Sequence, residues 1–238
     1  MAVLNIAAFM EEKSSNKKNK ISVGLLGGSF NPLHIGHLRV CTEMLEQAGL
    51  DHVELVPTHI PPHKGIEDIL SFDFRCAMLE SSVKDFEKIC VNPLESTRSG
   101  PSYTYDTLQI LVRDNPETSY YFIMGDKDLL TMPKWHKGRE IALLSNLLVV
   151  GRQGEDVQKV DDFIEGFWDI QKHSQGFWQI YQGKQIRYFT IPRIDISSSM
   201  LRSRWLSGKS IDWLVPEQAK RYLDTYRDEV IKTWQKSL

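Results

Sequence analysis

The sequence contains only three cysteines, and their positions support neither of the two common structural uses of this residue. Cys41, Cys76 and Cys90 show no C-x-x-C spacing and are odd in number. A zinc ribbon requires cysteines paired at short spacing, and a disulfide framework requires an even set. The cysteine usage therefore predicts a protein of the reducing cytoplasm.

Long apolar runs and an excess of positive charge are also absent. No run approaches the roughly eighteen apolar residues that are needed to span a bilayer. The N-terminus has no basic leader, so we expect residues 1–20 to form a flexible tail and not a secretory signal. The net charge of −2 argues against the clustered positive charge that binds nucleic acid. We expect small-molecule partners, with no nucleic acid and no membrane among them, and self-association into a homo-oligomer is left open.

With 238 residues, the chain is long enough for one large domain, which we expect over residues 21–238. Short apolar runs alternate with segments of helical periodicity. Strands are expected at 21–26, 53–56, 88–91, 119–124, 146–150 and 187–191, and helices at 38–50, 72–84, 104–113 and 197–206, with one long helix over 217–234. This alternation predicts an α/β fold with a doubly wound, mostly parallel, Rossmann-like sheet. Ligands of such sheets bind beyond the carboxyl ends of the strands.

Residues 152–185 interrupt this alternation with a polar, glycine-spaced segment. It contains Gly166-Phe-Trp-Asp-Ile170 and a similar sequence at Gly176-Phe-Trp-Gln-Ile180. We expect an inserted helix whose aromatic side chains pack on the body of the domain, because aromatics mostly supply buried area. A lid or a subunit contact remains open as an alternative. A helical C-terminal part is expected from about residue 197.

The strongest functional signal is the sequence Gly27-Gly-Ser-Phe-Asn-Pro-Leu-His-Ile-Gly-His37, directly after the first strand. Bare glycine backbone can approach a phosphate closely, and the N-terminus of the following helix favours an anion. His34 and His37 lie three residues apart, so one helix face can direct both at the same charge. A glycine turn or a single His-x-x-His is common without function, but the combination in one short block is not.

A second anion site is predicted at Ile196-Ser-Ser-Ser-Met-Leu-Arg202, where a helix begins after a strand. Serine hydroxyls, amide N–H groups and an arginine one turn later suit phosphate oxygens. Alone, the segment is ordinary serine capping with a surface arginine. Together with the first motif, it suits a nucleoside triphosphate, with the α-phosphate near the histidines and the outer phosphates near Arg202.

The first motif resembles the (H/T)xGH signature of nucleotidyltransferases, and the second resembles their ISSTxxR motif with Ser199 in place of threonine. Three further blocks at 61–64, 101–108 and 122–136 make the chain similar to bacterial nicotinate-nucleotide adenylyltransferases. The resemblance implies transfer of AMP from ATP to nicotinate mononucleotide, giving nicotinic acid adenine dinucleotide and pyrophosphate in NAD biosynthesis. It also implies Mg²⁺ on the ATP phosphates, with no metal ligand from protein side chains.

The same resemblance assigns roles to residues. The implied catalytic residues are His34, His37, Lys64 and Arg202. The implied ATP contacts are Gly27, Gly28, Ser29, Phe30, His34, His37, Gly125, Asp126, Asp128, Ile196, Ser197, Ser198 and Arg202. The implied contacts to nicotinate mononucleotide are Ser29, Asn31, Lys64, Thr104, Trp135 and His136. Trp135 would offer a stacking face, with core packing as the alternative.

The chain departs from the family pattern at one position. Members commonly have Gly-x-Asp where an acid meets the adenosine, and here that position is Lys127, flanked by Asp126 and Asp128. Either acid can take the role. Pantetheine-phosphate adenylyltransferase, which shares both phosphate motifs, and a nucleotide-binding regulatory module without turnover are the alternative functions. A cytidylyltransferase fits less well, and a metal site at His34-x-x-His37 lacks a third ligand at suitable spacing.

Overall fold

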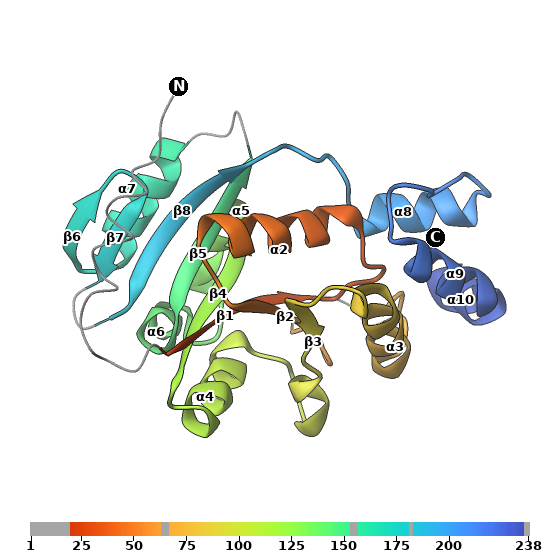
Figure 1. The fold of residues 1–238 in the computed structure, drawn as a ribbon, viewed down its shortest axis with the longest axis horizontal. Helices are drawn as coiled ribbons and strands as arrows, with labels where there is room; N and C mark the ends of the chain where they lie inside the picture. Colours follow the sequence, from red (N-terminus) through yellow and green to blue (C-terminus); the bar gives the residue numbers. More distant parts are fainter. Residues whose placement is uncertain (1–19, 63–66, 153–156, 181–182, 236–238) are drawn as a thin grey trace.

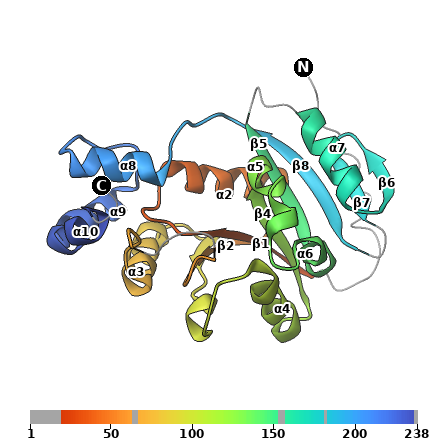
Figure 2. The ribbon, with the colours of Figure 1, turned by 180° about the vertical axis from the view of Figure 1, so that it is seen from behind.

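The computed structural model describes residues 20–62, 67–152, 157–180 and 183–235. Its centre is one eight-stranded sheet in the order β3-β2-β1-β4-β5-β8-β7-β6, with helices on both faces (Figures 1 and 2). The strands are β1 Ile21–Gly28, β2 His52–Pro57, β3 Ile89–Val91, β4 Thr118–Gly125, β5 Asn146–Arg152, β6 Ile170–Ser174, β7 Phe177–Ile180 and β8 Gln185–Ile191. Nearly all of the expected N-terminal tail lies outside the described residues.

Six neighbouring strands of the sheet are parallel, namely β3, β2, β1, β4, β5 and β8. This confirms the predicted mostly parallel α/β sheet. Strand β1 pairs with β2 on one side and with β4 on the other. The chain therefore winds outward from β1 to β3 and then returns to the other side of β1. This reversal is a topological switch point, where loops separate and leave a crevice for a ligand.

Two hydrophobic layers hold the helices on the sheet, because the central strands are apolar on both faces. On one face, helices α2 Ile35–Gln47, α3 Phe72–Val83 and α8 Ser198–Leu206 bury residues such as Met44, Met78 and Leu201. On the other face, helices α4 Thr104–Asp114, α6 Gly138–Leu144 and α7 Val157–Phe167 bury residues such as Leu108 and Ile141. Among the described residues, no helix is long and apolar enough to cross a membrane.

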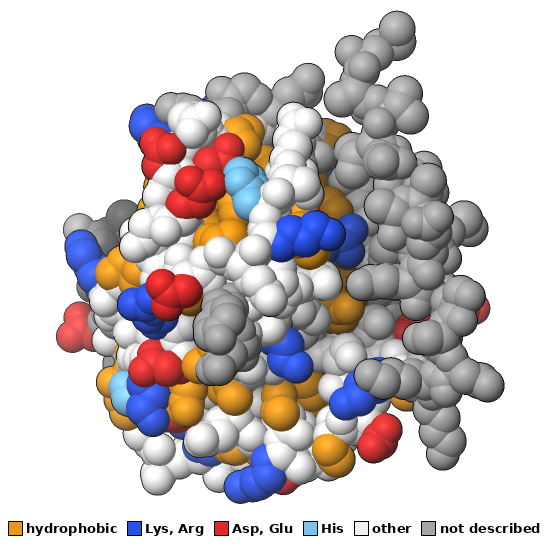
Figure 3. Space-filling view, turned by 90° about the vertical axis from the view of Figure 1, so that its left-hand side faces the viewer, with side chains coloured by type: hydrophobic (Ala, Val, Ile, Leu, Met, Phe, Trp, Pro, Cys, Tyr) orange, Lys and Arg blue, Asp and Glu red, His pale blue; other side chains and the backbone are white. Residues whose placement is uncertain are grey.

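The segment 152–185 contains helix α7 and an antiparallel hairpin of β6 and β7, which extends the sheet beyond β8. The hairpin was not expected from the sequence. The two Gly-Phe-Trp copies do not form a structural repeat, since one ends α7 and the other lies in β7. Trp168 and Trp178 are nevertheless both buried in the same core. On the side of the molecule that carries these elements, acidic and basic side chains are interspersed (Figure 3).

The prediction of one long C-terminal helix was wrong. Two helices, α9 Glu217–Thr225 and α10 Arg227–Trp234, meet at Tyr226, whose φ of −105° and ψ of 36° depart from helical values. The ring of Tyr226 packs against Phe74 of α3 at 5.8 Å between centroids. The break redirects α10, so that Trp234 is buried against Trp205 of α8.

Candidate active site

Two neighbouring cavities lie beyond the carboxyl ends of β1 and β4, at the switch point of the sheet. A small cavity of about 300 Å³ lies on the α4 side, and a large cavity of about 660 Å³ lies on the side of α2 and α8. Gly28, Ser29 and Asp128 line both. The prediction of a glycine turn was wrong, because Gly27 and Gly28 are the last two residues of β1 and pair with β2. A ligand with two parts can occupy both cavities and have its junction beside the end of β1.

The small cavity brings together four of the six residues predicted to contact nicotinate mononucleotide. Ser29, Thr104, Trp135 and His136 all line it, with Phe122 on the sheet side. The indole N–H of Trp135 donates to the Thr131 hydroxyl at 2.9 Å, and the Trp135 ring meets Phe122 edge to face. Trp135 is thus partly packed and also forms a wall of the cavity.

The start of α4 offers backbone N–H donors to this cavity, whose described lining also includes Glu95 and Asp128. Thr104 is the first residue of the helix, and the first N–H groups of a helix have no partner within it. His136 packs against the Tyr103 ring at 4.5 Å, and its Nε2 lies 3.8 Å from a carboxylate oxygen of Asp106. The arrangement suits a flat aromatic ligand that carries a negative group.

Two buried charged residues form hydrogen bonds to the loops and helix around the small cavity. Sequence reasoning missed both. Arg75 of α3 is 1% exposed and donates to the carbonyl oxygens of Ser29 and Thr58 at 2.8 Å and of Leu70 at 2.9 Å. Burial lowers the pKa of Arg75 below its usual value. Glu95, which lines the cavity, accepts hydrogen bonds from the Thr107 hydroxyl and the His59 N–H.

In the large cavity the two predicted histidines stack on each other. Their ring centroids are 3.6 Å apart, and the backbone N–H of His34 donates to Nδ1 of His37 at 3.2 Å. Burial, with a smaller effect from the positive charge of Arg152, lowers the pKa of His34 to about 4. Burial and then His34 hold the pKa of His37 well below its ordinary value. Both imidazoles are therefore neutral near pH 7.

The hydrogen bond to Nδ1 also fixes the tautomer of His37. A neutral imidazole that accepts at Nδ1 carries its proton on Nε2, so Nε2 is the donor that His37 offers to a ligand. Beneath it, the buried Phe30 ring packs edge to face at 5.0 Å. Gly36 allows close approach of the second motif, because a Cβ there would lie 2.9 Å from Cγ2 of Ile196.

The serine motif lies across the large cavity, where Ile196, Ser197, Ser198, Ser199 and Arg202 line the wall. Ser197 caps α8 by accepting from the Met200 N–H, and Ser198 donates to the carbonyl oxygen of Pro32 at 3.0 Å. Arg202 donates to the carbonyl oxygen of Asn31 at 3.0 Å and to Asp68 at 2.7 Å. The second motif is thus bonded directly to the first.

Two further cations of the large cavity were not predicted. Arg39 comes from the second turn of α2 and pairs with Glu43, and Arg152 ends β5 and lies 3.5 Å from Asp195. With Arg202, they place three guanidinium groups around the histidines, which suits a polyphosphate. The signal available in the sequence was the position of Arg152 two residues after the buried strand predicted at 146–150.

The structure separates the two acids of the Gly-Asp-Lys-Asp segment. Gly125 caps the short helix α5 Asp126–Leu129, and a carboxylate oxygen of Asp126 accepts from the Lys127 N–H at 2.6 Å. Asp128 lines both cavities, whereas Asp126 lines neither. Asp128 is therefore the acid that faces the candidate site.

Among the described residues, four that were predicted to contact a substrate line neither cavity, namely Phe30, Asn31, Gly125 and Asp126. Phe30 is 1% exposed and lines neither cavity. Asn31 is also buried, and its side chain donates to the carbonyl oxygen of Asp68 at 2.7 Å and accepts from the Leu70 N–H and the Trp234 indole. Lys64 lies outside the described residues. Binding roles for these four residues and for Lys64 remain predictions.

Comparison with known proteins identifies the class to which this protein belongs. Residues 25–204 match the cytidylyltransferase-like family model, and the fold and the two-part site define a nucleotidyltransferase. Proteins of *Enterococcus faecalis* and *Trichlorobacter lovleyi*, both named probable nicotinate-nucleotide adenylyltransferase, are 33% and 35% identical. The matches cover 93% and 85% of this chain and 92% and 96% of those proteins. The chain therefore belongs to the nicotinate-nucleotide adenylyltransferase family.

Solved structures confirm the fold. A *Plasmodium falciparum* nicotinic acid mononucleotide adenylyltransferase, solved in complex with NaAD, superposes with a TM-score of 0.68 at 20% identity. The match covers 87% of this chain and 97% of that one. A likeness at this identity establishes the shared Rossmann-like architecture.

Proposed function

We propose that this protein transfers AMP from ATP to nicotinate mononucleotide, releasing pyrophosphate and forming nicotinic acid adenine dinucleotide for NAD biosynthesis. The observation that carries the proposal is the pair of cavities joined at Gly28 and Ser29, with neutral stacked histidines on one side and an aromatic wall on the other. Each cavity suits one of the two substrates. Their reacting phosphates would meet at the end of β1.

The reaction would be a direct in-line displacement. A phosphate oxygen of the mononucleotide forms a bond to the α-phosphorus of ATP, and the bond to the leaving pyrophosphate breaks. No protein nucleophile is required, so catalysis consists of holding two polyanions together and stabilising the charge that develops. Nε2 of His37 would donate to an α-phosphate oxygen. The three arginines of the large cavity would neutralise the outer phosphates.

Magnesium would accompany ATP and neutralise phosphate charge when bound. Among the described residues that line the large cavity, Asp128 is the only one with a carboxylate, beside three arginines. This donor set suits an ion held mainly by phosphate oxygens, with Asp128 the side chain available to it. Lys64 would add a further cation if its loop reaches the phosphates.

The nicotinate ring would lie in the small cavity between Trp135 and the start of α4. Its carboxylate would accept from N–H groups near Thr104, where the helix dipole is positive. A pantetheine arm has no aromatic ring to stack on Trp135, so this cavity favours the pyridine nucleotide over that alternative.

The proposal is tested by following pyrophosphate release from Mg²⁺-ATP with three acceptors in parallel. Nicotinate mononucleotide should support turnover, nicotinamide mononucleotide should do so less well, and phosphopantetheine should not. Turnover with phosphopantetheine alone would assign the chain to the alternative adenylyltransferase. Nucleotide binding without pyrophosphate release from any acceptor would identify a regulatory module. Cytoplasmic location and a homo-oligomeric state remain predictions.

A further inference from the structure

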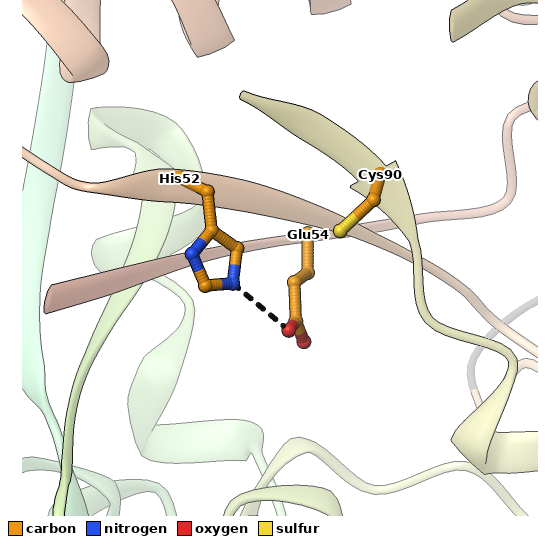
Figure 4. Close-up of side chains that lie close together, drawn as sticks. All are labelled: His52, Glu54 and Cys90. Carbon is orange, nitrogen blue, oxygen red and sulfur yellow. Dashed lines mark hydrogen bonds and ion pairs between the residues drawn. The ribbon is translucent and has the colours of Figure 1, made fainter. Parts of the chain in front are cut away.

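A second group of chemically active side chains lies on the outer part of the sheet, away from the two cavities. His52 and Glu54 of β2 and Cys90 of β3 project from the same face and converge (Figure 4). The sheet register explains this, because Glu54 lies opposite Cys90 and His52 lies two residues before Glu54. Their potential ligand atoms all lie within 4.8 Å of one another.

These three donors are the types that zinc prefers. Zinc binds thiolate at about 2.3 Å and imidazole or carboxylate at about 2.0–2.2 Å, usually in a tetrahedron. Tetrahedral geometry at those lengths places ligand atoms roughly 3.3–3.8 Å apart, so the group needs a contraction of about 1.5 Å at most. Cys90 is exposed and can supply this movement by a change of side-chain rotamer. Water would complete the fourth position.

The charge and hydrogen bonding of Glu54 also point to a cation. Its side chain is only 18% exposed, yet among the described residues no lysine or arginine lies within 4 Å of its carboxylate. One carboxylate oxygen accepts from the Asn92 amide at 2.6 Å, and the other faces Nε2 of His52 at 3.3 Å. Asn92 thus fixes the carboxylate as an outer hydrogen-bond partner does in a metal site.

We propose that His52, Glu54 and Cys90 bind one divalent transition-metal ion, for which zinc is the best match. Nothing in adenylyl transfer uses these side chains, and the wall of the small cavity begins on β2 only at Val56. The ion would fasten the three-residue edge strand β3 to β2. The site is structural, and it stabilises the β3 edge of the sheet, near the small cavity.

Cobalt substitution in the full-length protein tests the site, because a cobalt–thiolate bond produces an intense near-ultraviolet charge-transfer absorption. The metal-free protein is titrated with Co²⁺ and then with Zn²⁺ as competitor. One equivalent should give the thiolate absorption, and zinc should remove it. Cys90→Ser should abolish the absorption, and His52→Asn should weaken binding. Asn92→Ala should weaken it by about 10- to 100-fold, as loss of an outer-shell partner does.

The matched control is His173→Asn, which removes the imidazole of another surface His–Glu pair, the contact of His173 with Glu165 at 3.0 Å. This variant should bind the metal like the wild type. Thiolate absorption that persists in Cys90→Ser, or metal affinity unchanged by His52→Asn, would overturn the proposal.

A measurement on the wild type does not depend on the folding of any variant. Of the three cysteines, all within the described residues, only Cys90 is exposed. A thiol reagent should modify Cys90 in the metal-free protein, and stoichiometric zinc should slow this reaction. An alkylation rate that zinc leaves unchanged would also overturn the site.

Discussion

His37 has a defined use for each of its ring nitrogens. Nδ1 accepts the His34 N–H, which leaves the proton on Nε2 to be donated into the large cavity. A neutral donor of this kind binds ground-state phosphate only modestly and contributes most as charge builds in the transition state.

Replacement of His37 by alanine should therefore lower kcat by about 100- to 1,000-fold with little change in ATP affinity. Steady-state kinetics with Mg²⁺-ATP, together with direct ATP binding, measure the two effects separately. His173→Asn serves as control for a general effect of losing a histidine. A near-normal kcat in folded His37→Ala would remove His37 from the chemistry.

The two acids that follow Gly125 should differ in the same assay. Asp128 lines both cavities and Asp126 does not, so Asp128→Ala should raise the KM for ATP by about tenfold or more, as loss of a charged hydrogen bond does. Asp126→Ala should change it little. The reverse pattern would assign the contact to Asp126.

Replacement of Arg75 should mainly lower the stability of the folded protein. Its three hydrogen bonds satisfy buried carbonyl oxygens, and each lost partner costs about 1–3 kcal/mol. Arg75→Met should thus lower the free energy of unfolding by several kcal/mol, as measured by denaturant titration. Arg113→Met, which breaks an exposed pair with Asp114, is the matched control and should cost less than about 1 kcal/mol.

At the scale of elements, local patterns were sufficient for most helices and strands but not for those decided by distant contacts. The apolar runs of β1, β4 and β5 are buried on both faces and were predicted. Strand β6 was missed because four of its five residues are exposed, which removes the apolar alternation of a strand. The C-terminal helix was predicted as continuous because packing of Tyr226 on Phe74 cannot be inferred from spacing.

The same distinction holds for the site. His34, His37 and the serine motif lie in short blocks and could be found locally, as could Trp135. Arg75 could not, because its partners Ser29 and Thr58 lie 46 and 17 residues away in the chain. Within an amphipathic helix, an arginine on the buried side resembles an ordinary surface residue.

Helix α4 makes the choice of substrate an element-scale property. If its first N–H groups hold the ring substituent, a carboxylate accepts from them, whereas an amide can turn its own NH₂ donors toward them. An unpaired buried donor costs roughly 1–3 kcal/mol, which corresponds to about a tenfold to hundredfold preference for nicotinate over nicotinamide mononucleotide. Values of kcat/KM for both acceptors at equal Mg²⁺-ATP decide the matter. Equal values would contradict the placement of the ring at α4 without removing the adenylyl-transfer chemistry.

At the scale of the whole molecule, the buried histidines make folding stability depend on pH. The pKa of His34 falls to about 4 in the folded protein, whereas an unfolded chain keeps the ordinary value of 6.5. Below pH 6.5 the unfolded state binds a proton that the folded state does not. Protonation of His34 therefore costs no stability well above pH 6.5, and it destabilises the folded state progressively as the pH falls toward 4.

This loss amounts to about 3 kcal/mol from His34. Denaturant titrations between pH 7.5 and 4 should give a free energy of unfolding that falls as the pH is lowered. This fall should be smaller in His34→Asn. Comparison of the two proteins cancels the contribution of other titrating groups. An equal pH dependence of the free energy of unfolding in the two proteins would show that folding does not lower the pKa of His34.

The hydrogen bond between the Trp234 indole and Asn31 spans 203 positions of the sequence. Asn31 belongs to the first motif along the sequence, whereas Trp234 lies in helix α10. During synthesis, the Leu70 N–H can reach the amide oxygen of Asn31 early, but the Trp234 indole becomes available only after α10 has been made. Nascent chains cut short before α10 would thus carry both histidines but lack this second hydrogen bond to Asn31.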